Sequence, residues 1–479
     1  LSPQKSPMKQ ASASLAAADQ QPMRPTPRAI TLREITGFYL PLIFMTELIR
    51  ISHSIINAAL ARQPGATTAL AAYNLANSLS GVMGSVLVVV VSLALAFLVD
   101  RRSVHRVLIF SAICVSGVLV ITALMVTTPL GAFVFGTVLG GSPQVTEQAT
   151  WAYFILQMAL PIIMVRDLCM GVMMFFRRTI FITVGVAVRI ITVLLVIQVL
   201  PQLLIGATIG AASFLIGVTL ETLVLLAYCR PLYLSLPRQI GLATPLLAMA
   251  VFAWPLILVN VAEWGLILVT NVFLGRTESA DHALAAFGVL YVLLQLLLSP
   301  MKNLDKTAQA LVRHREDVPV FLRFSGITIL IFTGLLLLLF YTPLRGWVLG
   351  TVMGLDASLL ALAAPAALAA ILLPGFWGAD AACRGLLIAL RQTRSLAYTS
   401  VARLATVTLV GSSLLWLSGV NGVVIAVMGI SCAFAVQAGL LALRLRRFAH
   451  GKQYFARLAV PDTVDSSVEG TPNSTADRL

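Results

Sequence analysis

Long apolar stretches separated by short polar segments make up most of the 479 residues. A helix needs about 20 predominantly apolar residues to cross the hydrocarbon core of a bilayer. Twelve stretches are candidates, and we expect each to form a membrane-spanning helix. They are residues 36–61, 68–98, 106–128, 147–176, 179–201, 203–229, 248–275, 282–312, 321–343, 355–390, 395–417 and 421–445. The pattern predicts an all-α membrane protein.

The composition supports a membrane protein, because 59% of the residues are hydrophobic and only 11% are charged. Soluble domains carry about 25% charged residues. The two ends of the chain differ from the rest. Residues 1–35 and 449–479 are polar and rich in small residues, so we predict disordered tails. The first of them lacks the apolar run of a cleavable signal peptide.

Basic residues gather in alternate loops, which predicts the orientation of the chain. Lys and Arg are retained on the cytoplasmic side of a membrane. With the N-terminus inside, the outer loops contain only Arg62, Arg276 and Arg345. We therefore predict a cell (inner) membrane protein with both termini cytoplasmic. This asymmetry also accounts for most of the net charge of +14 without a nucleic-acid partner.

The sequence repeats itself at a constant offset. "FYLPLI" at 38–43 matches "FAWPLI" at 252–257, and "LAAY" at 70–73 matches "LAAF" at 284–287. A third match, at the same offset, joins 171–196 to 385–410 and aligns Arg189 with Arg403. Each repeat holds six spans, so both halves insert the same way up.

The repeat predicts two parallel six-helix lobes related by an axis along the membrane normal. We assign residues 36–230 to an N-lobe, 231–247 to a cytoplasmic linker and 248–448 to a C-lobe. Two such lobes around a central cavity form a transporter architecture. The binding site is expected near the bilayer midplane between the lobes, with alternating access by rocking.

Charged residues inside the eighth span indicate a polar pathway. Lys302, Asp305, Lys306 and Gln309 share one helix face. At 1.5 Å per residue, Lys302 lies roughly 16 Å from Arg313 at the helix end, near the midplane. A charge there costs about 2.5–3.5 kcal/mol, so it usually faces a cavity or a partner. We predict a face that binds an anion, with Asp305 orienting the lysines. Two alternatives are snorkelling lysines and a helix that breaks at Pro300.

Other spans carry further candidates. Glu47 and Arg50 in the first span are spaced to pair, and Asn260 and Glu263 lie in its repeat, the seventh. The predicted substrate-binding residues are Glu47, Arg50, Asn260, Glu263, Lys302, Asp305 and Lys306. Arg166, Asp167, Asp380 and Arg384 are predicted to gate or to join the lobes, the alternative being structural ion pairs. The repeated Arg189 and Arg403 are expected to stabilise their lobes.

These motifs carry a family resemblance. The two "F-x-x-P-L-I" helices and the turns "RRT" at 177–179 and "RQT" at 391–393, each followed by a helix with an arginine, resemble the multidrug/oligosaccharidyl-lipid/polysaccharide (MOP) exporter superfamily. It includes MATE drug exporters and lipid-linked sugar flippases. With "PMKNLDK" at 300–306 and "NVFLGR" at 271–276, the chain over 36–448 is most similar to the progressive ankylosis (ANK) family.

The resemblance implies a MATE-like fold and export of anions such as pyrophosphate, citrate and nucleotides. Proton-coupled MATE exporters commonly carry an aspartate in the first helix, where this chain has "SIINAAL" with Asn57. This difference disfavours drug-cation antiport.

We therefore expect an alternating-access secondary transporter that exports a small organic or phosphorylated anion, with H⁺ or Na⁺ as the coupling ion. The alternatives are a flippase for an anionic lipid-linked sugar and a MATE-type multidrug exporter. An enzyme is not expected, because we find no metal-spaced histidines, Gly-rich phosphate loop or nucleophile motif. The five cysteines are scattered singly, so neither a disulfide framework nor a zinc site is predicted, and no cofactor is expected.

Overall fold

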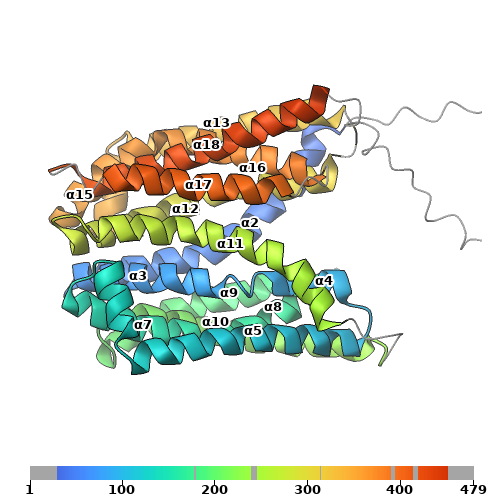
Figure 1. Ribbon diagram of the computed structural model, residues 1–479, viewed down its shortest axis with the longest axis horizontal. Helices are drawn as coiled ribbons and strands as arrows, with labels where there is room; N and C mark the ends of the chain where they lie inside the picture. The colour runs from blue at the N-terminus through green and yellow to red at the C-terminus, as the bar shows by residue number, and fades with distance from the viewer. Residues whose placement is uncertain are drawn as a thin grey trace, which may run out of the picture.

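The computed structural model describes residues 30–176, 178, 180–238, 245–312, 314, 316–389, 394–413 and 419–450. Nearly all of these residues are helical (Figure 1). The predicted tails lie outside the described residues except at 30–35 and 449–450. Part of the linker, part of the "RRT" turn and all of the "RQT" turn also lie outside them. The first helix begins at Leu32 rather than at residue 36, because Thr31 and Glu34 form a capping box at its start.

The helices occur at all twelve predicted positions, and several of them are interrupted. The N-lobe contains α2 (Leu32–Leu60), α3 (Ala66–Gly84), α4 (Val89–Phe97), α5 (Arg101–Thr127), α6 (Leu130–Ala132), the π-helix η1 (Phe133–Val138), α7 (Pro143–Met158), α8 (Leu160–Phe175), α9 (Ile180–Val199), the 3₁₀ helix η2 (Leu200–Gln202) and α10 (Ala207–Ser235). α10 therefore extends into the predicted linker.

The C-lobe repeats this order. It contains α11 (Leu246–Leu274), α12 (Ala280–Leu311), α13 (Asp317–Phe340), α14 (Leu344–Gly346), the π-helix η3 (Trp347–Val352), α15 (Ala357–Ala369), the 3₁₀ helix η4 (Ala370–Leu372), α16 (Leu373–Ala389), α17 (Arg394–Ser412) and α18 (Gly422–His450). α12 continues through Pro300 to Leu311, so the alternative of a break at the proline is wrong.

Among the described residues, ten helical segments are long and apolar enough to cross a membrane. The two predicted spans outside this set are α2 and α17, which interrupt their apolar residues with polar and charged ones. The chain is a multi-pass, all-α membrane protein. Its most enclosed span is α12, where 78% of the most apolar window is buried against 17% for α11.

Helix boundaries follow the sequence repeat. The bounds of α2 and α11 differ by the same constant offset as the matched motifs, and so do those of the pair α3–α4 and α12. The repeat also relates two segments that the sequence analysis overlooked, "PLGAFVFGTVLG" at 129–140 and "PLRGWVLGTVMG" at 343–354. Each forms a short α-helix followed by a π-helix and ends on a glycine with positive φ. The lobes are therefore structural repeats.

The first helix of each lobe begins against the other lobe, and Figure 1 shows α2 and α11 running obliquely between the two groups of helices. At the start of α2, Tyr39 donates a hydrogen bond of 2.9 Å to the Pro300 carbonyl and packs edge-on against Phe324. At the start of α11, Phe252 packs edge-on against Phe97 of α4. Both helices thus connect the lobes.

We call the end where α2 begins and α18 ends the tail end, and the opposite end, with residues 61–66 and 275–280, the far end (Figure 1). At the far end the lobes are in close contact. Arg62 donates hydrogen bonds of 2.7 Å to the carbonyls of Thr351 and Val352. Gly140 lies so close to Gly275 that an added Cβ would be 2.0 Å from the Gly275 carbonyl oxygen. The far end is therefore closed.

Candidate functional site

A cavity of about 1080 Å³ occupies the tail-end half of the C-lobe. α11, α12, α16 and α17 line most of it, and the N-lobe contributes Arg50 and Val88. Its polar and charged lining residues are Arg50, Asn260, Glu263, Ser299, Lys302, Asn303, Asp305, Lys306, Gln309, Arg384, Tyr398, Ser400 and Gln437. The predicted position between the lobes therefore holds only in part, because C-lobe helices make most of the wall.

A second cavity of about 180 Å³ lies between the lobes and is lined by residues of α2, α3, α11 and α12. Its lining includes His53, whose ring lies 5.4 Å from the ring of Phe214. Four residues line both cavities, and all four were predicted to bind substrate: Arg50, Asn260, Glu263 and Lys302. These residues form the junction between the cavities, and we call them the junction residues.

Lys302 forms an ion pair with Glu263 of α11. The two side chains are 30% and 31% exposed, so both remain in reach of the cavities. The Lys302 ammonium also lies 5.2 Å from the centre of the Trp377 ring. For Lys302 the prediction that Asp305 orients the lysine is wrong, because the partner of Lys302 comes from a neighbouring helix. Asp305 lines the large cavity, and its Oδ1 accepts no hydrogen bond from the described residues.

Lys306 is exposed in the tail-end part of the large cavity and forms no ion pair with a described residue. Gln309, one turn further on, is also exposed, and its amide donates to the Asp305 carbonyl at 3.1 Å. The predicted polar face of α12 is thus a wall of the cavity. Lys306 lies close to the helix end, where its ammonium reaches solvent.

Glu47 and Arg50 do not form the predicted ion pair. Glu47 instead accepts a hydrogen bond from the Ser299 hydroxyl, which ties α2 to α12 across the lobes. Arg50 forms no ion pair or hydrogen bond with a described residue, although it lines both cavities. The nearby α12 hydroxyl supplies Glu47 with a partner, so the guanidinium stays available. Asn260 donates its amide to the Leu256 carbonyl at 2.9 Å.

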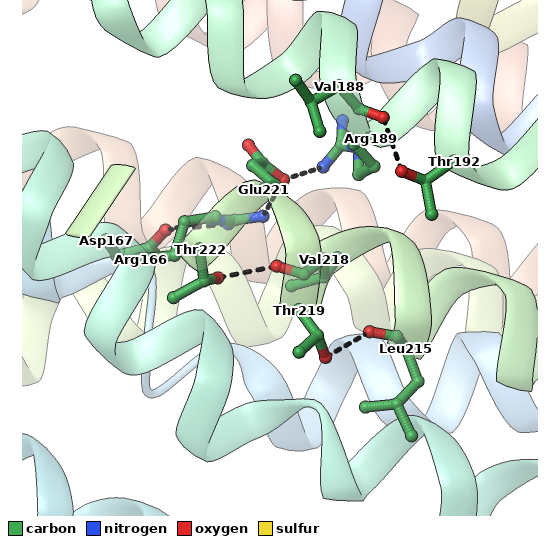
Figure 2. A network of polar contacts seen from close by, with 10 residues as sticks. All are labelled: Arg166, Asp167, Val188, Arg189, Thr192, Leu215, Val218, Thr219, Glu221 and Thr222. Atoms are coloured by element: carbon green, nitrogen blue, oxygen red, sulfur yellow. Dashed lines mark hydrogen bonds and ion pairs between the residues drawn. The ribbon is translucent and has the colours of Figure 1, made fainter. Parts of the chain in front are cut away.

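The predicted gating residues fall into two separate places. Asp380, fully buried in α16, pairs with Arg384 one turn later, and Arg384 lines the large cavity. Arg166 and Asp167 pair at 2.8 Å within the N-lobe and line neither cavity. Figure 2 shows that their network continues to Glu221 and Arg189. The two predicted pairs are therefore not brought together.

The N-lobe network ties three helices to one another. Glu221 of α10 accepts from Arg189 of α9 at 3.2 Å and lies 3.7 Å from Arg166 of α8 (Figure 2). Glu221 and Arg189 are almost completely buried. Two guanidinium groups and two carboxylates balance in charge, so the network suits a structural role. The sequence analysis noted Arg189 without its partner, because Glu221 lies 32 residues away.

Two residues that the sequence analysis did not select also line the large cavity. Trp377 faces Lys302 across the cavity wall, and Ser299 connects to Glu47. The only sequence signal for Trp377 is its position between Pro374 and Asp380 in α16. Among the described residues, no group of three His, Cys, Asp or Glu side chains is arranged to hold a metal ion.

The lining decides what the large cavity can hold. Of its described charged residues, four are basic (Arg50, Lys302, Lys306 and Arg384) and two are acidic (Glu263 and Asp305). Apolar and aromatic side chains, including Trp254 and Trp377, complete the walls. The cavity is suited to an anion, with room for an apolar part.

No protein-family model matches this chain, and no curated protein sequence matches it. Solved structures do match. One is a lipid II flippase, MurJ, in an inward closed conformation, at 13% identity and a TM-score of 0.62 over 85% of this chain and 87% of that chain. Another is the eukaryotic MATE transporter AtDTX14, at 14% identity and a TM-score of 0.58, covering 89% and 97%.

A third is the MATE multidrug transporter DinF-BH, at 15% identity and a TM-score of 0.59, covering 89% of this chain and 98% of that chain. A further match is described as a MATE family transporter of the MOP superfamily. At such low identities the likeness concerns the fold. The chain therefore shares its helical fold with MATE transporters and MurJ.

Proposed function

We propose that this protein is an alternating-access secondary transporter that exports a small organic or phosphorylated anion, of the citrate, pyrophosphate or nucleotide kind. The observation that carries the proposal is the excess of basic over acidic residues among the described residues of the large cavity. The fold shared with transporters supports it. The closer resemblance to the progressive ankylosis family stays a prediction.

The junction residues supply the binding chemistry. The Arg50 guanidinium forms no ion pair or hydrogen bond with a described residue, and it can bind a carboxylate or phosphate with two parallel hydrogen bonds. Lys302 already has a carboxylate partner in Glu263, so an anion that reaches the junction competes with Glu263 for the ammonium. Once a proton or Na⁺ neutralises Glu263 or Asp305, the positive charge of the cavity increases. These carboxylates are therefore our candidates for the groups that bind the coupling ion.

The large cavity and the closed far end fit one state of a transport cycle. The cavity lies between the tail-end halves of α11, α12, α16 and α17, while Arg62 and Gly140 take part in the contacts that close the far end. If the tails are cytoplasmic, as the loop charges predict, this conformation faces inward. An anion then enters from the cytoplasm, and separation of the far-end contacts releases it outside.

The test is uptake of labelled citrate and pyrophosphate into proteoliposomes. Arg50→Gln and Lys302→Gln should each raise KM about tenfold or more, because loss of a charged hydrogen bond costs about 1.5–3 kcal/mol. Arg102→Gln, at an exposed site on α5 outside both cavities, should leave KM unchanged. Saturable uptake with unchanged KM in both junction variants would contradict the proposed site.

One observation favours a flippase as the second candidate. The exposed apolar residues Trp254 and Leu258 of α11 line the large cavity and are 61% and 40% exposed. Such a wall can admit a lipid tail while the basic residues bind its headgroup. Movement of a fluorescent anionic lipid-linked sugar across the bilayer, without citrate or pyrophosphate uptake, would favour this candidate. Transport of cationic dyes alone would favour multidrug export.

A further inference from the structure

Lys302 and three other side chains of the C-lobe form a continuous column behind the cavity wall. The Lys302 ammonium lies 5.2 Å from the Trp377 ring centre. Trp377 stacks on Phe434 with 4.7 Å between ring centres and 13° between the planes. The Arg403 guanidinium carbon lies 5.3 Å from the Phe434 ring centre, which completes the column. Two cations therefore enclose two stacked aromatic rings, and they come from α12, α16, α18 and α17.

The inner cation of this column forms no ion pair with a described residue, and Glu263 and Asp380 are the carboxylates that act on it electrostatically. Arg403 is only 1% exposed, and it forms no hydrogen bond with a described residue. A buried charge is costly unless other groups compensate for its lost hydration. The face of an aromatic ring attracts a cation electrostatically, and the attraction is strongest when the pair is desolvated. Phe434 therefore provides part of the compensation that a carboxylate normally supplies.

The internal repeat shows how the same arginine is treated in the other lobe. Arg189 occupies the position of Arg403 in the N-lobe, where Glu221 neutralises it at 3.2 Å. The buried positions of α10 and α18 match at an offset of 216 residues, which places Gln437, 2% exposed, at the position of Glu221. The N-lobe counterparts of Lys302, Trp377 and Phe434 are Val88, Met164 and Val218, so that lobe has neither the lysine nor the two rings.

The N-lobe thus buries its arginine in a network of balanced charge. The C-lobe arginine forms no ion pair with a described residue and lies on the Phe434 ring, behind the cavity wall. The fold itself does not require the second arrangement, because the N-lobe folds with the first. The column is present only where Lys302 lines the cavity. This difference indicates that Arg403 acts on the cavity site rather than stabilising the C-lobe.

We infer that Arg403 is a positioning residue for the anion site. Its charge, together with the Trp377–Phe434 pair, holds the Lys302 ammonium at the junction and makes the cavity favour anions of higher charge. The inference rests on the proposed function, since it assigns selectivity to the same site. Neither Arg403 nor Phe434 lines the cavities, so both act through Trp377 and Lys302.

The repeat suggests a direct test, in which the arginine–glutamate pair of the N-lobe is introduced into the C-lobe. Gln437→Glu should place a carboxylate beside Arg403, as Glu221 lies beside Arg189. We expect KM for pyrophosphate to rise about tenfold, equivalent to about 1.4 kcal/mol. Arg444→Gln, which removes a charge at an exposed site of α18 outside both cavities, should stay within about twofold of wild type. KM for the singly charged anion lactate should change less than KM for pyrophosphate.

A second pair of variants separates charge from structure. Arg403→Gln should raise KM for pyrophosphate as Gln437→Glu does, whereas Arg403→Lys should restore most of the wild-type value because it keeps the cation. A residue that only stabilised the lobe would change Vmax and the amount of folded protein for all substrates alike. Wild-type KM in both Gln437→Glu and Arg403→Gln would overturn the inference.

A spectroscopic measurement keeps the inference distinct from the proposed function. A variant with Trp377 as its single tryptophan reports on the column by its fluorescence. Lys302→Met and Arg403→Gln should each shift the emission, because each removes a charge from one end of the ring pair. If the wild type transports neither anion, the proposed function fails, and unchanged emission in both variants would overturn the column as well.

Discussion

Lys302 has two acidic residues near it, Asp305 in its own helix and Glu263 on α11. It pairs with Glu263, because the carboxylate on the facing helix lies within reach of the ammonium across the cavity wall. Asp305 then remains without a hydrogen bond at Oδ1 from the described residues. The pairing of Lys302 with Glu263 matters for function, because it neutralises one of the two cations at the junction. Arg50 is then the cation that remains to bind an anion.

Glu263→Gln should lower KM for citrate, roughly threefold, by freeing the Lys302 ammonium for the anion. The cost in stability should be about 1 kcal/mol or less, because both side chains are partly exposed and solvent screens the pair. Proteoliposome uptake and thermal unfolding measure the two effects. Glu278→Gln, at an exposed far-end site, serves as the matched control. A raised KM would mean that Glu263 contributes to binding directly.

At the scale of elements, buried polar groups tie the helices together. In the N-lobe, Glu221 joins α10 to α8 and α9, and in the C-lobe Ser299 and Pro300 of α12 contact Glu47 and Tyr39 of α2. α12 stays continuous through Pro300, and its surroundings are almost entirely protein. Its repeat is interrupted between α3 and α4. Repeated sequence therefore allows different helix continuity in the two lobes.

Glu221→Gln should lower the stability of the N-lobe by about 3–5 kcal/mol, because it leaves two buried guanidinium groups with one carboxylate. Thermal unfolding in detergent measures the loss. Thr219→Ala on the same helix removes only a hydroxyl that donates to the Leu215 carbonyl (Figure 2), so it should have little effect. Equal unfolding temperatures for Glu221→Gln and wild type would show that the network adds nothing to stability.

At the scale of the whole molecule, the two lobes meet tightly at the far end and enclose the large cavity toward the tail end. The far-end contacts use repeated parts, since Gly140 and Gly354 each follow a π-helix and each lie against the end of the first helix of the other lobe. Both glycines have positive φ, a conformation that side chains rarely adopt. Opening of the far end requires these contacts to separate.

Gly140→Ala should prevent close contact at the far end, because its Cβ would lie 2.0 Å from the Gly275 carbonyl oxygen. A cysteine replacing Ser78 in the small cavity, in a background without the native cysteines, should then react faster with a membrane-impermeant thiol reagent. Gly346→Ala is the matched control, because an added Cβ there meets no atom within 4 Å. The same reaction rate in Gly140→Ala and Gly346→Ala would contradict the assigned closure.

The sequence by itself determined the helices, the two-fold repeat and the identity of the charged residues at membrane depth. These depend on the length of apolar runs and on a constant offset, both of which are local or periodic properties of the chain. The four junction residues were all among its candidates. That they lie together was decided by the packing of three helices, because Arg50 comes from α2, Asn260 and Glu263 from α11, and Lys302 from α12.

Only the tertiary structure decided which charges pair and which stay available. Glu263 lies 39 residues from Lys302, and Ser299 lies 252 residues from Glu47, so neither contact follows from spacing along one helix. The column from Lys302 to Arg403 likewise joins four helices. The physical reason is that a buried charge takes the nearest compensating group in space, and the packing of helices determines which group that is.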